Sequence, residues 1–71
     1  NEIITEYVSS NIKGGKYNTM TKVLEITFNN GMVYEYEDVS HEVFAELNLA
    51  ESQGKYFNVN IAKKYNYKKV L

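Results

Sequence analysis

The clearest feature of the sequence is a pair of short segments in which apolar and polar residues alternate. Residues 23–28 and residues 32–37 both show the two-residue period of a β-strand with one buried face. Their apolar positions are Leu24, Ile26 and Phe28 in the first segment and Met32, Tyr34 and Tyr36 in the second. The intervening Asn29-Asn30-Gly31 is typical of a hairpin turn, so the two segments predict adjacent antiparallel strands.

The length of this turn decides which way the tyrosine side chains point. A two-residue turn would put Tyr34 and Tyr36 on the charged face of the hairpin. A three-residue turn with a bulge at Gly31 pairs Phe28 with Met32 and puts both tyrosines on the apolar face. We favour the three-residue turn, because it leaves every glutamate of the two strands facing water. Both rings are then predicted to lie mainly in the core, with hydroxyls that reach its rim or a partner.

Two helices are predicted after the hairpin. Ser40 is a favourable N-cap for the first, and apolar residues recur behind it at helical spacing: Val43, Phe44, Leu47 and Ala50. Residues 52–54 interrupt this pattern. A second helix is predicted over about residues 54–63, with Phe57 and Ile61 facing inward.

The two ends of the chain show weaker patterns. Residues 3–12 favour a strand or an extended entry, and residues 16–18 favour a short strand, with Gly14-Gly15 between them as a turn signal. A last short strand is predicted within residues 65–70. The whole pattern predicts one α+β domain over residues 1–71. We expect a small antiparallel sheet of three to four strands with a central hairpin, followed by two helices and a short C-terminal strand.

The composition fits a single small globular domain. The chain has 71 residues and no cysteine, so neither disulfides nor a cysteine-based metal site can stabilise it. A domain of this size buries only about 60% of the surface of its unfolded chain, so we expect self-association to contribute stability. No apolar run is long enough to span a membrane, and the N-terminus shows no secretory signal. We therefore expect a cytoplasmic protein with no membrane partner.

Charge is divided unevenly along the chain. Residues 1–51 hold all nine acidic residues and three lysines, a formal charge of −6, and residues 52–71 hold five lysines and no acidic residue, a formal charge of +5. Such a division indicates either a basic tail for an anionic partner or head-to-tail complementarity between copies. The basic segment also contains Tyr56, Phe57, Tyr65 and Tyr67. Lysines bind phosphates and aromatic rings stack on bases, so this composition is typical of a site for a nucleotide or a single-stranded nucleic acid. The alternative is a short C-terminal helix whose lysines interact with the helix dipole and whose tyrosines lie in the core.

No set of residues predicts catalysis or metal binding. The single histidine, His41, lies just inside a predicted helix start and has no second histidine or cysteine as a metal partner. The acidic residues within 35–38 are expected to face water. Ser9 and Ser10 have no nearby base and no nucleophile-elbow motif, so they are expected either to form a turn or to hydrogen bond a phosphate or a base. We expect no enzymatic activity, no metal and no cofactor.

Residues 52–58, Ser-Gln-Gly-Lys-Tyr-Phe-Asn, are the best candidate for a binding site. A small residue that opens a helix exposes free N–H groups at the positive end of the helix dipole, and Lys55 adds a positive charge. The segment is not a P-loop, because the glycine spacing and the Lys-Ser/Thr pair are absent. The alternative is that Gly54 only ends the preceding helix.

Several segments together resemble the KTSC domain. They are Val8-Ser9-Ser10-Asn11-Ile12, Tyr17, Leu24-Glu25-Ile26-Thr27-Phe28, Gly31-Met32-Val33-Tyr34-Glu35-Tyr36 and Gly54-Lys55-Tyr56-Phe57-Asn58-Val59-Asn60-Ile61. The central Tyr-x-Tyr and the last of these segments are the most specific. The family usually has a proline before its final tyrosine, where this chain has Asn66 before Tyr67, a departure that affects only the expected geometry of the tail.

The resemblance implies a small α+β fold with no known catalytic activity. The domain is named for the C-terminus of some lysyl-tRNA synthetases, and this fusion suggests RNA binding. It also occurs as free-standing small proteins in bacteria and their phages. Small free-standing viral domains are associated with sponges, which sequester the cyclic nucleotide signals of the host anti-phage systems CBASS and Thoeris. For a free-standing domain the resemblance implies a sponge, acting in the cytoplasm of the bacterial host if the protein is viral, more than an accessory module.

We therefore expect a non-enzymatic protein that sequesters a cyclic dinucleotide such as 3′,3′-cGAMP and blocks CBASS signalling. The alternative is an RNA-binding accessory module with single-stranded RNA as its partner. The expected ligand-binding residues are Ser9, Ser10, Tyr34, Tyr36, Lys55, Tyr56, Phe57, Asn58 and Asn60. Lysine and serine side chains would contact phosphates, aromatic rings would stack on bases, and an asparagine would read a base edge. One small domain cannot enclose a dinucleotide, so we expect a homo-oligomer, a dimer or a tetramer, with sites shared between subunits.

Overall fold

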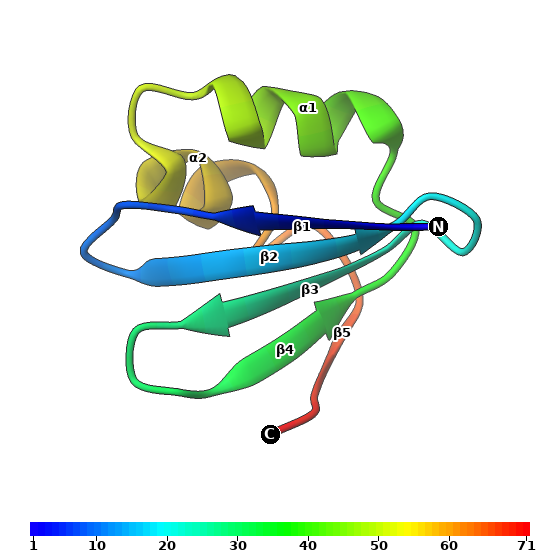
Figure 1. Cartoon of the computed structure of the whole chain (residues 1–71), viewed down its shortest axis with the longest axis horizontal. Coiled ribbons are helices and arrows are strands. Elements are labelled where there is room, and N and C mark those ends of the chain that lie inside the picture. The colour runs from blue at the N-terminus through cyan, green and yellow to red at the C-terminus, as the bar shows by residue number, and fades with distance from the viewer.

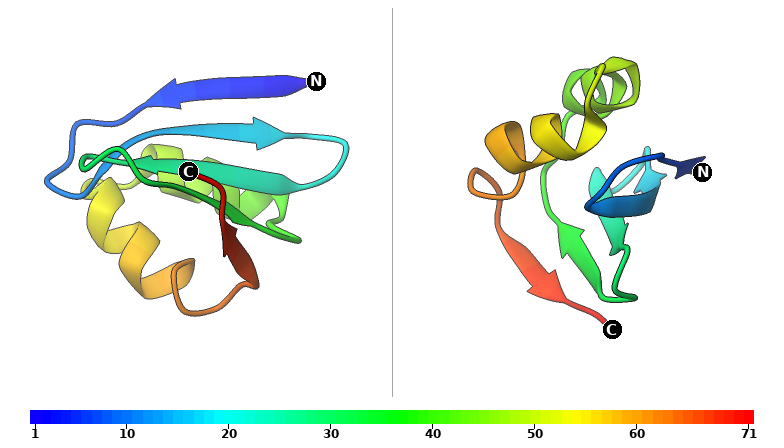
Figure 2. Two further views of the ribbon diagram at one scale, coloured as in Figure 1. Left: turned by 90° about the horizontal axis from the view of Figure 1, so that it is seen from below. Right: turned by 90° about the vertical axis from the view of Figure 1, so that its left-hand side faces the viewer.

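Five β-strands form one antiparallel sheet, in which each strand lies beside the next strand of the sequence. The computed structural model covers residues 1–71, and its strands are β1 (Glu2–Glu6), β2 (Ile12–Asn18), β3 (Val23–Phe28), β4 (Val33–Tyr36) and β5 (Tyr67–Lys69). Helices α1 (His41–Leu49) and α2 (Gln53–Asn60) lie between β4 and β5 in the chain and pack on one face of the sheet (Figure 1). Seen along the sheet, both helices lie on this inner face and the outer face is uncovered (Figure 2).

The architecture confirms the α+β class that the sequence predicts. The order of elements is also confirmed, with the central hairpin, then two helices, then a short C-terminal strand. The sheet has five strands rather than three to four, because β5 returns to pair with β4 and extends the same sheet.

The central hairpin turns over three residues, as the separation of apolar and charged positions predicts. The backbone N–H of Phe28 donates to the carbonyl of Met32 at 2.8 Å, and Gly31 has a φ of 91°. The left-handed conformation that this turn requires favours glycine at that position. In the resulting register Tyr36 lies opposite Leu24, so the tyrosines of β4 share the inner face with the apolar side chains of β3.

Strand β2 runs through Gly14-Gly15, where the sequence signal indicates a turn, so that prediction is wrong. Both glycines pair with β1, and a Cβ atom on Gly14 would lie 2.8 Å from the carbonyl oxygen of Thr5. Glycine at this position therefore allows the backbone of β1 to lie close to β2. The pairing of β2 with β3 shifts register nearby, between Ile12 and Gly14. The chain reverses instead over residues 7–11, which join β1 to β2.

Serine caps begin both helices. The Oγ of Ser40 accepts a hydrogen bond from the backbone N–H of Val43 at 3.2 Å, which confirms the predicted N-cap. The Oγ of Ser52 accepts one from the N–H of Lys55 at 3.3 Å, so α2 begins at Gln53, close to its predicted start. Neither helix is long and apolar enough to cross a membrane.

Aromatic rings fill the core between the helices and the inner face of the sheet. The ring of Phe57 on α2 packs edge-on against Tyr36 and Phe28, with centroid distances of 5.4 and 5.5 Å. Nearer to α1, Tyr17 stacks on Phe44 at 4.4 Å. Tyr36 is 3% exposed and Phe57 is 1% exposed, which confirms that both rings face inward. The ring of Phe57 therefore holds α2 against the sheet.

Tyr36 makes the stability of the fold depend on pH in the alkaline range. Burial first, and then the neighbouring Tyr34 and Tyr67, raise the pKa of Tyr36 to about 12 from 10.0. Because the fold favours the neutral phenol, this stabilisation is fully present below the unfolded pKa of 10.0 and is lost as the pH rises toward 12. Tyr36→Phe keeps the ring, so we expect an unchanged Tm at neutral pH and a smaller loss of Tm in alkali. Thermal unfolding of both proteins across this range is the measurement, and equal losses in both would contradict the assignment.

Candidate functional site

A groove lies where the β1–β2 loop meets the start of α2. It has a volume of about 480 Å³ and is lined by residues 8–11, by residues 51–55 and by Asn58. This loop groove brings together four of the predicted binding residues from two distant parts of the chain: Ser9, Ser10, Lys55 and Asn58. It is therefore the candidate site that agrees best with the sequence.

Hydrogen bonds fix the loop that forms one wall of the groove. The Oγ of Ser9 accepts from the backbone N–H groups of Asn11 and Ile12, at 3.0 and 3.3 Å. The side-chain amide of Asn29 donates to the carbonyl of Ser9 at 2.9 Å. The Nδ2 of Asn11 donates to the Oδ1 of Asn58 at 3.3 Å and so joins the loop to α2. Ser9 is thus a turn-forming residue, and its hydroxyl keeps one proton that can be donated to a ligand.

The first turn of α2 lies directly against this loop because residue 54 is glycine. Gly54 is buried, and a Cβ atom placed on it would lie 2.6 Å from the Oγ of Ser9. Any larger residue would force the Ser9 side chain or the start of α2 to move. Gly54 therefore has a packing role inside α2 and does not end α1, which stops before the Ser52 cap.

Several residues with free hydrogen-bond donors line the groove. The backbone N–H groups of Gln53 and Gly54 belong to the first turn of α2 and have no hydrogen-bond acceptor in the chain. The ammonium group of Lys55 is exposed and forms no ion pair, and Ser10 is exposed beside it. The carboxylate of Glu51 also lines the groove and opposes the charge of Lys55. An anion would therefore be held mainly by directed hydrogen bonds and the helix dipole.

A second groove, of about 380 Å³, lies along the other side of α2. Lys55 borders both grooves, whereas Tyr56 and Asn60 line only this one. The hydroxyl of Tyr56 donates to the Oε1 of Glu46 at 2.6 Å. Burial, this hydrogen bond and the charge of Glu46 raise the pKa of Tyr56 to about 12. Tyr56 therefore ties α2 to α1, and the Nδ2 of Asn60 donates back to the carbonyl of Tyr56 at 3.2 Å.

The remaining predicted residues lie outside both grooves. Tyr36 and Phe57 are core residues with no free ring face, so the expectation that they stack on a base is corrected by their burial. Tyr34 is half-buried on the inner face, where its ring packs against Phe28 and Tyr67 with centroid distances of 5.5 Å to each. The two-residue period of a strand and the helical period identified these residues, but residues of a protein core follow the same periods. In the structure Tyr36 and Phe57 lie in the core and Tyr34 packs against it.

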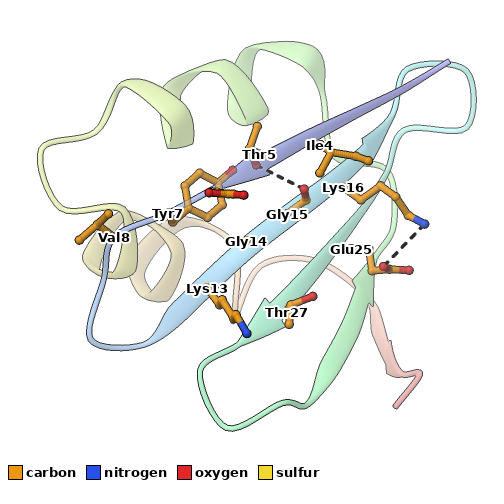
Figure 3. A pocket seen from close by; sticks show the side chains of 11 residues that line it. Ile4, Thr5, Tyr7, Val8, Lys13, Gly14, Gly15, Lys16, Glu25 and Thr27 are labelled. Atoms are coloured by element: carbon orange, nitrogen blue, oxygen red, sulfur yellow. Dashed lines mark hydrogen bonds and ion pairs between the residues drawn. The ribbon is translucent and has the colours of Figure 1, made fainter.

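A depression of about 520 Å³ on the outer face of the sheet was not predicted (Figure 3). Gly14 lies in its floor, and its lining includes Lys13 and Lys16 together with Glu6 and Glu25. The two signs of charge balance there, and none of the predicted binding residues lines it. The sequence shows this glycine only as a turn signal, so it gave no sign of the depression.

Sequence reasoning also missed Asn11 and Glu51, which border the loop groove. The polar Ser-Ser-Asn run before Ile12 is a turn signal that could have identified Asn11.

The single histidine, His41, is exposed, with its Nε2 3.2 Å from the carbonyl oxygen of Thr19. The structure contains no group of three or more His, Cys, Asp or Glu side chains that could hold a metal ion.

Gly54→Ala tests whether this close approach shapes the site. We expect the extra methyl group to destabilise the fold by about 1–3 kcal/mol, because it collides with the Oγ of Ser9. Ser9→Ala removes that oxygen, so the cost of Gly54→Ala should fall by about 1 kcal/mol or more in the Ser9→Ala background. Urea unfolding of the four proteins of this cycle is the measurement. Additive costs would show that the two positions do not touch.

Comparison with known proteins agrees with this description. The family model of the KTSC domain matches residues 8–65. A lysine–tRNA ligase of Trichormus variabilis is 39% identical over 59 residues, which are 83% of this chain and 10% of the ligase. An uncharacterized protein of Stutzerimonas stutzeri is 38% identical over 50 residues, 70% of each chain. The chain thus spans about a tenth of the length of the ligases it matches.

A solved structure shows the same fold over the whole length of the chain. The crystal structure of a KTSC domain protein from Yersinia pestis has a TM-score of 0.90 and 26% sequence identity, and it covers 100% of both chains. The family match includes the loop of residues 8–11 and all of α2, so both walls of the loop groove lie inside the shared domain. The chain is a member of the KTSC domain family.

Proposed function

We propose that this KTSC domain binds phosphate groups of a nucleotide in the loop groove and holds the ligand without cleaving it. The observation that carries the proposal is the convergence of Lys55, the unpartnered N–H groups of Gln53 and Gly54, and the hydroxyl of Ser10 on one groove. Backbone N–H groups at a helix start together with a lysine are a common arrangement for phosphate oxygens.

A base can be recognised next to these phosphate donors. The hydrogen bond between Asn11 and Asn58 uses one amide hydrogen of Asn11 and the carbonyl oxygen of Asn58. It leaves the Oδ1 of Asn11 on the loop and the neighbouring Nδ2 of Asn58 on α2 unpartnered at the same groove. An acceptor and a donor side by side match the edge of a nucleobase. The ligand class that we propose is a cyclic dinucleotide such as 3′,3′-cGAMP, which offers phosphates and bases within a short distance.

Sequestration is the role that suits these groups. The Oγ of Ser9 accepts only from backbone N–H groups, and neither Ser9 nor Ser10 is hydrogen bonded to a histidine or a carboxylate that could activate it. A domain of this kind would withdraw the signal in the cytoplasm of a bacterial cell and so block CBASS signalling. One domain of this size cannot enclose a dinucleotide, so a second copy would be needed to enclose the ligand.

RNA binding is the second candidate, and the similarity to part of a lysine–tRNA ligase favours it. Single-stranded RNA would be bound through exposed lysines and exposed tyrosines such as Tyr67. That mode gives an affinity that falls steeply with salt, since several counterions are released. Binding in the loop groove depends mainly on hydrogen bonds, so its affinity should fall only weakly with salt. The salt dependence therefore distinguishes the two functions.

A release assay tests the proposed function. The purified protein is mixed with 3′,3′-cGAMP, the free nucleotide is measured, and the protein is then denatured by heat and the supernatant chromatographed. We expect depletion of free nucleotide before heating and recovery of intact nucleotide after it. A changed product would make the protein an enzyme, and no depletion would contradict the proposed ligand.

Two substitutions with opposite expected effects test whether binding takes place in the loop groove. Lys55→Ala should weaken binding about tenfold, because it removes a charged donor. Glu51→Gln should strengthen binding, because it removes the opposing carboxylate at the same groove. Lys64→Ala is the matched control, since Lys64 is an exposed lysine that lines neither groove. Calorimetric titration of the four proteins is the measurement, and equal effects of the two lysine substitutions would argue for nonspecific attraction.

A further inference from the structure

Strand β1 leaves one edge of the sheet open. The N–H of Tyr7 donates to Lys13 and the N–H of Thr19 donates to Asn1, so the odd-numbered residues of this segment face β2. In an antiparallel pair the alternate residues direct their N–H and C=O groups the other way. Glu2, Ile4 and Glu6 therefore present unpaired backbone groups at the edge. The side chain of Ile4 is 75% exposed at its centre.

Strand β5 leaves the opposite edge open. The N–H of Glu37 donates to Asn66, and the N–H of Val70 donates to Val33, so alternate residues of the C-terminal segment face β4. Tyr67 and Lys69 consequently direct their backbone groups outward. The side chain of Tyr67 is 57% exposed.

The two open edges are complementary in charge and in apolar character. The two ion pairs of the molecule are Lys16–Glu25 and Lys68–Glu35. The carboxylates of Glu2 and Glu6 on one edge and the ammonium of Lys69 on the other therefore have no partner. Each edge also has an exposed apolar residue next to its charge. Native proteins usually cover or blunt an edge of this kind, and neighbouring copies of the chain can cover the two edges of each molecule.

We propose that β1 of one copy pairs antiparallel with β5 of a second copy, so that the sheet continues from one molecule into the next. One register places Ile4 opposite Tyr67 and Glu2 opposite Lys69, which joins apolar to apolar and acid to base. The proposal concerns the sheet edges alone and does not rest on the nucleotide function of the loop groove.

Charge favours this head-to-tail contact over a symmetric one. A two-fold pairing of β1 with itself around Ile4 would place Glu2 of one copy opposite Glu6 of the other, twice, and like charges opposite one another are destabilising. A β1–β5 contact uses different surfaces on the two copies, so assembly continues until it closes or is capped. Because β5 has only three residues, the contact is small and the association is expected to be weak and sensitive to salt.

The test uses proline to block one edge at a time. Ile4→Pro and Lys69→Pro each remove an outward N–H group while leaving the ladder inside the molecule intact. Sedimentation equilibrium at low salt should show that the mass of the wild-type protein rises above 8.2 kDa with concentration, whereas each variant alone stays at that mass. Mixed together, the two variants retain one working edge of each kind. They should form a one-to-one pair of twice the single-chain mass and nothing larger.

Charge variants keep the proposal testable if a proline variant fails to fold. Glu2→Lys and Lys69→Glu should each weaken association, and the chain that carries both should recover it, because the charges are then exchanged. A wild-type protein that stays at 8.2 kDa at every concentration would overturn the proposal. Association that persists in both proline variants, or that the double charge exchange fails to restore, would also overturn it.

Discussion

The close contact between Gly54 and Ser9 is the constraint on which the candidate site depends. Because residue 54 has no Cβ atom, the start of α2 lies against the β1–β2 loop, and a Cβ there would be 2.6 Å from the oxygen of Ser9. The contact places the free N–H groups of Gln53 and Gly54 beside Ser10 and Asn11. The Oγ of Ser9 in turn accepts hydrogen bonds from the loop backbone, so the loop keeps its shape against the helix. The contact therefore brings donors from two distant parts of the chain to one groove.

The helical period then divides one short motif between stability and binding. Phe57 faces the aromatic core and is 1% exposed, while Lys55 and Asn58, two residues before it and one after it, face the loop groove. Tyr56 points toward α1 and is held there by Glu46 at 2.6 Å. The same few residues thus anchor α2 to the sheet, join it to α1 and provide the donors of the groove. A substitution in this motif is expected to affect either folding or ligand affinity according to the face it occupies.

Local patterns predicted the parts of the fold that local chemistry determines. The two-residue period and the glycine turn predicted the register of the central hairpin, and Ser40 marked the start of α1 because its side chain bonds to the adjacent turn. The failures concern long-range contacts. Gly14 was predicted in a turn because the close approach of Thr5 that requires a glycine is not visible in its own neighbourhood. Periodicity likewise could not tell whether an inward ring such as Phe57 faces the core or a ligand.

The central claim of this account is that the loop groove receives the phosphate of a nucleotide. The most direct measurement is a titration of the ¹⁵N-labelled protein with 3′,3′-cGAMP, followed by the amide resonances. The account predicts that the largest shifts fall on the N–H groups of residues 9–11 and of Gln53, Gly54 and Lys55. Shifts centred on the outer face of the sheet around Gly14, or no shifts at all, would contradict it.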